Sequence, residues 1–280
     1  MRDLVGLIPA AGRATRIAPL PCSKELLPVG WQVGADGRRR PKVVSQYLVE
    51  RMRAAGTSRI LFVVRDGKWD IGSYYGDGGR CGVPIGYLHI GEPWGPPFTL
   101  TQATPFIGTA DVVFGFPDIL VDPVDSFSPL IERMDRTGAD VVLGLFDCRA
   151  DEPGDVIERT AEGRITSLET KEQRPIRPDR YVCWMFATWR PTFTRFLTDR
   201  CAELAVEARD RAAASPQEPM PEWPVGALIA AAISAGLHVD SHHFAGGRFL
   251  DVGTPDGLIA AERFPIVWNG RDPAPAAGAG

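Results

Sequence analysis

The sequence lacks the features of several specialised protein classes. No run of apolar residues approaches the roughly 18 that a membrane-spanning helix needs, so we expect no membrane protein. A net charge of −4 gives no excess of cations for binding nucleic acid or an anionic membrane. The chain opens with Arg2 and Asp3 before a short apolar run, which does not fit a secretory signal peptide.

Cysteine is scarce, and its spacing matches no common metal or redox motif. The chain has five cysteines, an odd number, and no two of them stand as C-x-x-C. We therefore expect reduced thiols in a cytoplasmic protein, and neither a disulfide nor a zinc site. Cys22 has no histidine close to it in sequence, which favours a small filler residue over the alternative of a catalytic thiol.

What is present is the composition of a soluble globular protein. The 280 residues are 44% hydrophobic and 24% charged, and a chain of this length can bury a sizeable core. We expect one domain over residues 1–268 and a disordered tail over residues 269–280, which is rich in proline, alanine and glycine. The sequence leaves a homo-oligomer open.

Strand and helix patterns alternate along the first half of the chain. Buried strands are expected at residues 4–8, 60–64, 112–116 and 141–146. Between the first two strands, residues 30–40 are expected to form a loop and Pro41 to lie in the first turn of a helix that Gly56 ends. This alternation predicts an α/β fold with a doubly wound sheet, in which the first two strands are parallel.

The loop after the first strand has the composition of a phosphate-binding loop. Ala10, Ala11 and Gly12 are small and allow backbone N–H groups to approach a ligand. Three cations follow at Arg13, Arg16 and Lys24. Amides and cations together suit a polyphosphate. We therefore expect the rest of the chain to be organised around this loop.

Two aspartates follow predicted strands further along the chain. Asp118 comes after the strand at 112–116, and Asp251 comes after a short strand at Phe249 and Leu250. Ligands of open α/β sheets bind at the carboxyl ends of the strands, and Mg²⁺ prefers one or two carboxylates together with phosphate oxygens. The pair predicts a magnesium site, although either aspartate alone is more often a turn or helix-cap residue.

Four segments resemble motifs of one enzyme family. The segment PAAGRATRIAPLPCSKELLPV resembles the opening motif of the sugar-1-phosphate nucleotidylyltransferases, nearest to the bacterial uridylyl- and thymidylyltransferases that act on glucose 1-phosphate. The segments GFPDILVDP, SLETKE and FLDVGTPDGLIAAE resemble three further motifs, in the family's order. Together the four segments span residues 7–262.

The resemblance implies a fold, a reaction and a set of site residues. The fold would be a three-layer αβα sandwich with a mixed, mostly parallel, Rossmann-like sheet. The reaction would convert an NTP and a sugar 1-phosphate into an NDP-sugar and pyrophosphate, with Mg²⁺ on Asp118 and Asp251. Catalysis would fall to Arg16 on the leaving phosphates and Lys24 on the α-phosphate. Nucleotide contacts would come from Ala10, Ala11, Gly12, Arg13, Ala14, Thr15, Glu92 and Thr99, and sugar-phosphate contacts from Glu169 and Lys171.

The chain departs from the family motifs at several positions. Ala14 replaces a glycine, and its methyl group is tolerable only if its φ is negative or the loop shifts. Ser23 replaces the proline before Lys24, and Glu172 replaces the proline after Lys171. These differences remove no charge from the expected site.

Two further departures concern the substrates. Glu92 stands at or near the glutamine that reads uracil or thymine, and a carboxylate only accepts hydrogen bonds, which favours a base edge with two donors such as guanine. Cys183 and Trp184 stand where the family has small residues, which predicts an acceptor other than plain glucose 1-phosphate.

Two alternative functions have different sequence requirements. A catalytically inactive homologue that only binds nucleotide should have lost a metal aspartate or the lysine, and Asp118, Asp251 and Lys24 are all present. An NAD(P)-dependent dehydrogenase should carry G-x-G-x-x-G after the first strand, and Gly12 is the one glycine of that loop.

Overall fold

A computed structural model describes residues 3–34, 36–91, 95–149, 151–152, 154–173, 178–214 and 222–265, with the backbone alone at 212–214. The predicted tail at 269–280 and Glu92 lie outside these ranges. Within them, no helix is both apolar enough and long enough to cross a bilayer.

Seven strands form the central sheet, in the order β12-β8-β11-β6-β1-β4-β5. Their bounds are β1 (Leu4–Pro9), β4 (Arg59–Arg65), β5 (Ile85–Ile90), β6 (Asp111–Gly115), β8 (Val141–Arg149), β11 (Arg180–Trp189) and β12 (Val239–His243). β11 is antiparallel to both of its neighbours, and the other pairs are parallel. The predicted parallel pairing of the first two long strands, β1 and β4, is confirmed.

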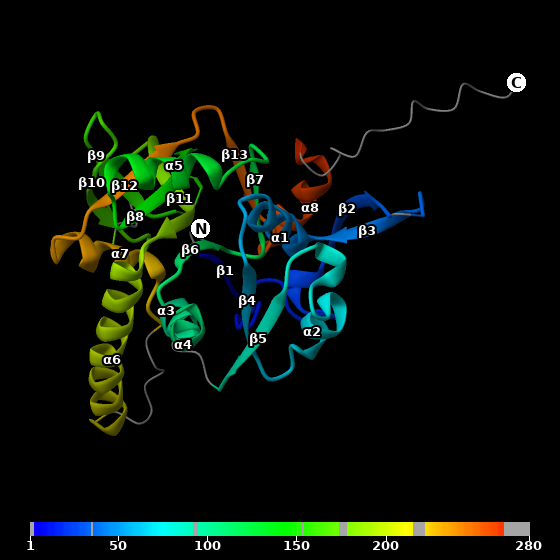
Figure 1. The fold of residues 1–280 in the computed structure, drawn as a ribbon, viewed down its shortest axis with the longest axis horizontal. Coiled ribbons are helices and arrows are strands. Elements are labelled where there is room, and N and C mark those ends of the chain that lie inside the picture. The colour runs from blue at the N-terminus through cyan, green and yellow to red at the C-terminus, as the bar shows by residue number, and fades with distance from the viewer. Residues whose placement is uncertain are drawn as a thin grey trace, which may run out of the picture.

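Helices cover both faces of this sheet. Their bounds are α1 (Val44–Ala54), α2 (Trp69–Tyr75), α3 (Pro96–Thr101), α4 (Thr104–Ile107), α5 (Ser128–Thr137), α6 (Pro191–Ala214), α7 (Val225–Ser234) and α8 (Pro255–Ala260), with short 3₁₀ turns at Lys24–Leu26, Gly79–Cys81 and Ala261–Arg263. One apolar core joins α1, α2 and α5 to the sheet, and a second joins α3, α4, α6 and α7. Figure 1 shows α6 well apart from α1 and α2.

The residues of β1 show why the sheet lies between two cores. Leu4 and Ile8 pack in the first core, whereas Val5 and Leu7 pack in the second, as the two-residue period of a strand requires. The three-layer αβα fold with a mostly parallel sheet is confirmed. Because β1, β4, β5 and β6 are parallel, the loops that follow them all leave from one edge of the sheet.

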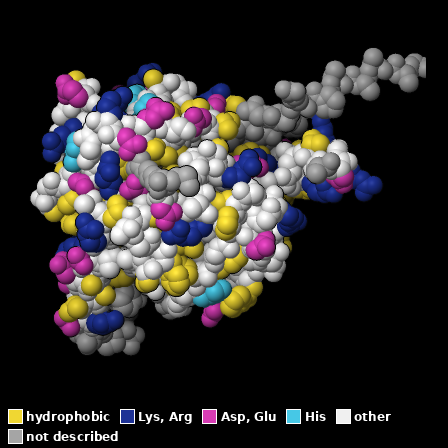
Figure 2. Space-filling view, viewed as in Figure 1, with side chains coloured by type: hydrophobic (Ala, Val, Ile, Leu, Met, Phe, Trp, Pro, Cys, Tyr) yellow, Lys and Arg dark blue, Asp and Glu magenta, His cyan; other side chains and the backbone are white. Residues whose placement is uncertain are grey.

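The segment expected to be a loop at residues 30–40 is largely a hairpin. β2 (Pro28–Val33) pairs antiparallel with β3 (Arg39–Val43), so Pro41 lies in a strand and α1 begins only at Val44. Trp31 and Val33 are about half exposed, so the hairpin lacks the buried face that marks a strand in sequence. It projects from the body of the protein, and on the face in Figure 2 its cations mix with acidic side chains rather than forming a patch.

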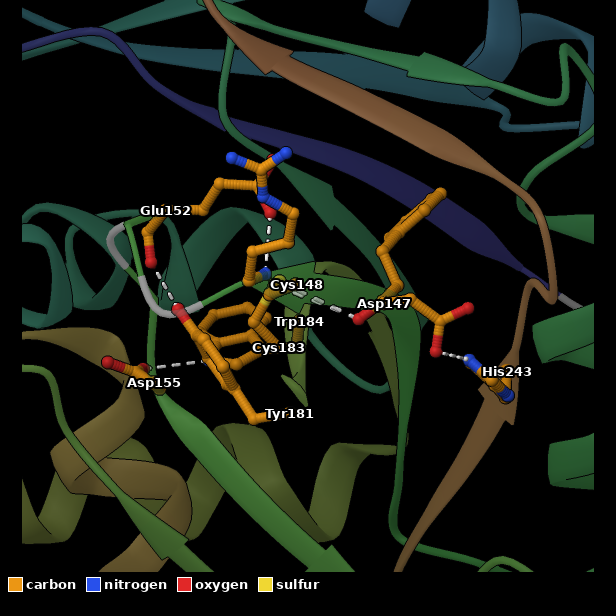
Figure 3. The surroundings of a disulfide bond; sticks show 10 residues. Asp147, Cys148, Glu152, Asp155, Tyr181, Cys183, Trp184 and His243 are labelled. Atoms are coloured by element: carbon orange, nitrogen blue, oxygen red, sulfur yellow. Dashed lines mark hydrogen bonds and ion pairs between the residues drawn. A yellow bond between two sulfur atoms is a disulfide. The ribbon is translucent and has the colours of Figure 1, made fainter. Parts of the chain in front are cut away.

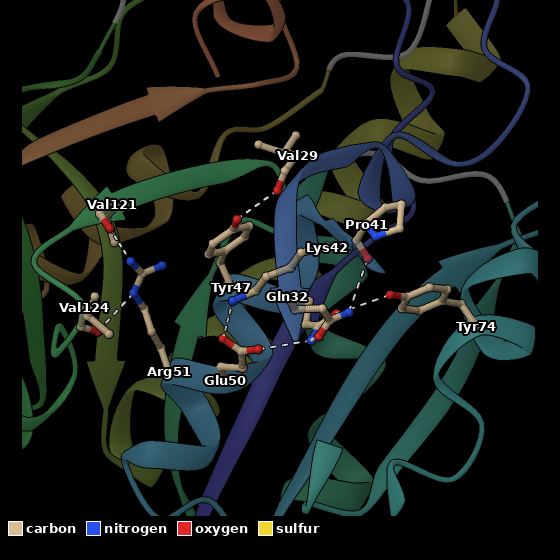
Figure 4. Close-up of polar contacts among 11 residues, drawn as sticks. Val29, Gln32, Pro41, Lys42, Tyr47, Glu50, Arg51, Tyr74, Val121 and Val124 are labelled. Atoms are coloured by element: carbon tan, nitrogen blue, oxygen red, sulfur yellow. Dashed lines mark hydrogen bonds and ion pairs between the residues drawn. The ribbon is translucent and has the colours of Figure 1, made fainter. Parts of the chain in front are cut away.

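Helix α1 fixes two segments that lead toward the expected site. The buried guanidinium of Arg51 donates to the carbonyls of Val121 and Val124, which follow Asp118 in the chain. The Tyr47 hydroxyl donates to the Val29 carbonyl at 2.8 Å. Figure 4 shows both contacts, together with the ion pair of Lys42 with Glu50. The helix therefore braces both strand β7 (Ile119–Asp122), with the residues just after it, and strand β2.

The expectation of five reduced thiols is wrong for two of them. Cys148 on β8 and Cys183 on β11 are joined by a disulfide (Figure 3). Cys22, Cys81 and Cys201 are free. The register places Cys148 opposite Tyr181 and Cys183 opposite Phe146, so the cysteines are diagonal neighbours on one face of the antiparallel pair. Strand register between positions 35 residues apart is not visible in cysteine spacing.

Candidate active site

The loop after β1 borders a cavity of about 230 Å³ at the carboxyl edge of the sheet. Ala10 and Ala11 are buried beneath it, and the Ala10 N–H donates to the Val63 carbonyl of β4 at 2.8 Å. The cavity is lined by Pro9, Ala11, Gly12, Arg13, Thr15, Lys24, Gly95, Pro96, Thr99, Phe116, Asp118 and Glu222. Four residues of the predicted nucleotide loop are thus brought to one space with Lys24, Thr99 and Asp118, whereas Ala10 and Ala14 do not line it.

Ala14 has a left-handed backbone conformation, of the kind that favours glycine. Its φ is +56°, the one positive value among the non-glycine residues that the structure describes. Of the two conditions expected for a methyl group here, the negative φ is wrong, and the shifted loop stays a prediction. A left-handed alanine costs roughly 1–2 kcal/mol, so this loop holds local strain.

Lys24 reaches across the cavity to Asp118. Its Nζ lies 2.6 Å from Oδ2 of Asp118, and both side chains are mostly buried. Burial lowers the pKa of Lys24, but the charge and hydrogen bond of Asp118, together with the charges of Glu25 and Asp251, outweigh it and raise the pKa above its usual range. Lys24 is consequently a fixed cation at neutral pH.

Asp251 lies beside Asp118 because of a second, smaller sheet. β13 (Arg248–Asp251) pairs antiparallel with β7 (Ile119–Asp122), in a register that puts Asp251 opposite Ile119. The Val252 N–H also donates to the Asp118 carbonyl at 2.9 Å. The pairing joins two positions more than 130 residues apart in the sequence. The sequence alone therefore could not show how close Asp118 and Asp251 lie in the fold.

Gly253 leaves a space between the two carboxylates. A Cβ atom built on it would lie 2.6 Å from Oδ2 of Asp118 and 2.9 Å from Oδ1 of Asp251, closer than real side chains approach. The Gly253 N–H itself donates to Oδ1 of Asp251 at 2.8 Å. The same point is 3.1 Å from Nη2 of Arg16, whose Nη1 pairs with Asp251 at 3.0 Å. Three of the predicted charged residues therefore converge around one glycine, and the fourth, Lys24, joins them through its ion pair with Asp118.

This arrangement has the donor set that a magnesium ion uses. Mg²⁺ is usually held by one or two carboxylates, with substrate phosphates and water completing the shell. Asp118 and Asp251 each place a carboxylate oxygen within 3 Å of the same point, the position of a Cβ on Gly253. Across the described part of the chain no larger cluster of His, Cys, Asp or Glu forms a metal site. The residues present thus fit a cation bound together with phosphate.

Glu169 and Lys171 are not among the residues that line this cavity. They lie at and just beyond the end of β10 (Ile165–Glu169), which pairs with β9 (Val156–Arg159). The Lys171 N–H donates to Asp155 at 3.1 Å, and the Lys171 ammonium lies 3.8 Å from Glu172. Their role toward the sugar phosphate stays a prediction.

Several residues around the cavity were not anticipated from the sequence. Phe116 and Glu222 contribute to the lining. Trp184, which the sequence did single out, packs on Phe116 at a ring distance of 5.8 Å, and its indole N–H donates to the half-buried Asp155 at 2.9 Å. Motif patterns cannot show such contacts because the partners come from separate strands. Gly253 could have been found, since it belongs to the D-V-G-T-P segment already singled out.

Comparisons with known proteins point in the same direction as this geometry. The chain is 30% identical over 173 residues to a glucose-1-phosphate thymidylyltransferase of Streptomyces griseus, and 26% identical over 174 residues to one of Streptomyces antibioticus. The resemblance to the sugar-1-phosphate nucleotidylyltransferases is confirmed. Each alignment includes 60% of this chain, which covers 45% of the length of each relative. No protein-family profile matches.

The fold comparison extends over nearly the whole chain. A crystal structure of a proposed glucose-1-phosphate thymidylyltransferase from Bacillus anthracis, in complex with a sucrose, superposes with a TM-score of 0.72. The match covers 93% of this chain and 94% of the other, at 18% sequence identity. At 18% identity, this structural likeness shows the fold alone.

Proposed function

We propose that this protein transfers a nucleotidyl group from an NTP to a sugar 1-phosphate, or to a sugar-like phosphate, and releases pyrophosphate. The observation that carries the proposal is a chain of close contacts beside the loop that follows β1. Asp118, Asp251 and Arg16 converge around Gly253, and Lys24, which lines the cavity with Asp118, forms an ion pair with it. Likeness to relatives named as thymidylyltransferases supports the reaction class. We further propose that the protein binds both substrates in the cytoplasm.

The reaction requires charge neutralisation and positioning more than covalent help. A phosphate oxygen of the sugar phosphate attacks the α-phosphorus, and the bond from that phosphorus to the bridging oxygen of the β-phosphate breaks. Lys24, fixed as a cation in the cavity, would neutralise charge on the α-phosphate. Arg16, whose side chain is half exposed, would hold the leaving phosphates.

Asp118 and Asp251 would hold Mg²⁺ in this proposal. When bound, the ion would neutralise phosphate charge and help to orient the phosphates. The protein itself holds both carboxylates in place, since that of Asp251 accepts from the Gly253 N–H and that of Asp118 accepts from the Lys24 ammonium. A preformed pair of ligands reduces the ordering cost of binding.

The proposal also concerns which base of the NTP and which sugar phosphate the protein selects. Glu92, outside the described residues, is proposed to favour a base edge with two donors, such as guanine. Trp184 fills the space beside Phe116, a cavity-lining residue, at a position where the family resemblance implies a small residue. We therefore propose an acceptor other than plain glucose 1-phosphate.

The test is a pyrophosphate-release assay with Mg²⁺ and a panel of substrates. Each of GTP, UTP, dTTP, CTP and ATP is combined with a set of hexose and pentose 1-phosphates, and products are identified by mass spectrometry. We expect an NDP-sugar from at least one pair, with loss of activity in EDTA. Nucleotide binding without turnover across the panel would instead favour an inactive homologue. A strong UTP preference would contradict the role of Glu92, and ordinary turnover of glucose 1-phosphate would contradict the role of Trp184.

A further inference from the structure

Ser23, the residue immediately before Lys24, gives both of its hydrogen-bond donors to Asp70. Its backbone N–H lies 2.7 Å from Oδ2 of Asp70, and its hydroxyl lies 2.6 Å from Oδ1. Ser23 is buried, and hydrogen bonds to an ionised acceptor are stronger than those between neutral groups. The contact ties the loop to the first turn of α2, 47 residues further along the chain.

Glu25, the residue immediately after Lys24, is anchored to the same segment. Both of its carboxylate oxygens accept from Nζ of Lys68 at 2.7 Å, and its side chain has no exposed surface. The Ser45 hydroxyl donates to the Glu25 carbonyl at 2.6 Å. Lys24 therefore extends from a backbone that residues 68–70 hold on both sides.

We propose that Asp70 is a positioning residue, which acts through Ser23 to fix the direction in which Lys24 reaches Asp118 and the phosphate. This inference rests on the proposed function. Position 23 is a proline in the family motif, and Ser23 has a φ of −57°, close to the roughly −65° that a proline ring imposes. In this chain the Asp70 carboxylate supplies the restraint that a ring would supply.

The experiment compares four forms of the full-length protein: wild type, Asp70→Ala, the double variant Ser23→Pro with Asp70→Ala, and Asp66→Ala. The last removes an exposed carboxylate from the same loop and serves as the matched control. Asp70 also accepts from the Ile71 N–H, at 3.0 Å. Because the single and double variants both lose that contact, restoration by proline isolates the contribution of Ser23.

In Asp70→Ala we expect kcat to fall about 10- to 100-fold with KM for both substrates nearly unchanged, since small misplacement of a catalytic group costs rates of this order. The double variant should regain most of the lost kcat, and Asp66→Ala should match wild type. A merely structural role predicts lower thermal stability without a selective loss of kcat. Wild-type kcat in Asp70→Ala, or a folded double variant that stays as slow as the single one, would overturn the inference.

Hydrogen exchange provides a readout that does not depend on activity. Amides in the peptide covering residues 20–27 should exchange faster in Asp70→Ala than in wild type, and should regain protection in the double variant. If the wild type is inactive with every substrate pair, the proposed function fails, and the exchange data decide whether Asp70 restrains this loop. Equal exchange in wild type and Asp70→Ala would reject the restraint by itself.

Discussion

The ammonium of Lys24 lies 2.6 Å from Oδ2 of Asp118, across the cavity that the loop after β1 borders. One residue is proposed to neutralise the attacked phosphate and the other to hold the metal. Each therefore stabilises the other's charge before substrate binds, and neither charge is left unpaired in a mostly buried place.

Replacing Lys24 by methionine should remove a cation that acts on the transition state. We expect kcat/KM for pyrophosphate release to fall about 10²- to 10³-fold, by analogy with the loss of one donor to a developing oxyanion. Lys42→Met is the control, because Lys42 is similarly buried and similarly paired, with Glu50, away from the cavity. Equal rate losses in the two variants would show that folding, and not chemistry, is being measured.

Replacing Gly253 by alanine should fill the space between the two carboxylates. Its φ is not in the left-handed region, so the backbone accepts the methyl group, but a Cβ would lie within 3 Å of Asp118 and Asp251. We expect a folded protein with little activity and weakened Mg²⁺ binding, measured by steady-state kinetics and calorimetry. Gly72→Ala, where a Cβ meets its nearest neighbour at 3.9 Å, should behave as wild type. Full activity of Gly253→Ala would contradict the proposed site.

The fold could be predicted in outline because its strongest signals are local. Apolar strands alternating with helices indicated the parallel sheet, and β1 with β4 pair as expected. The β2–β3 hairpin was missed because Trp31 and Val33 stay exposed and three arginines follow, so its residues show no buried face. The reversed direction of β11 depends on pairing with β6 and β8, which no local pattern specifies.

The site was predictable where a residue belongs to a motif. Arg16, Lys24, Asp118 and Asp251 lie close together as their motifs imply. Asp70 and Lys68 were missed because they support the site through contacts 43 to 47 residues away in sequence. Such partners are chosen by the three-dimensional packing of loops, which motif spacing does not encode.

The thiols give a direct measurement of the Cys148–Cys183 bond. Protein purified without reductant and then denatured should titrate three thiols with Ellman's reagent, and five after reduction. Replacing both cysteines by alanine should lower the free energy of unfolding by about 2–4 kcal/mol, since the bond closes a loop of some 35 residues. Five free thiols before reduction would contradict the bond.

The buried pair of Lys68 and Glu25 should be costly to break on one side only. Lys68→Met leaves the Glu25 carboxylate without its partner in a place with no solvent exposure, and we expect a loss of about 3–5 kcal/mol in unfolding free energy. The double variant Glu25→Leu with Lys68→Met should recover most of that loss, because no charge remains buried. Urea denaturation of the two variants decides the point, and equal destabilisation of both would show that the charge itself is not the cause.

His242 on β12 should make stability depend on pH below neutrality. Burial foremost, and then the positive charge of Arg133, lower the pKa of His242 beneath its usual 6.5. The unfolded chain therefore binds a proton at this histidine at a higher pH than the folded chain does. The unfolding free energy falls as the pH drops below about 6.5. The contribution of His242 to this fall ends once the pH is below its folded pKa. We expect His242→Gln to lose less stability than wild type between pH 7.5 and pH 5, measured by urea denaturation at each pH with the values at pH 7.5 as reference. Parallel curves for the two proteins would contradict the lowered pKa.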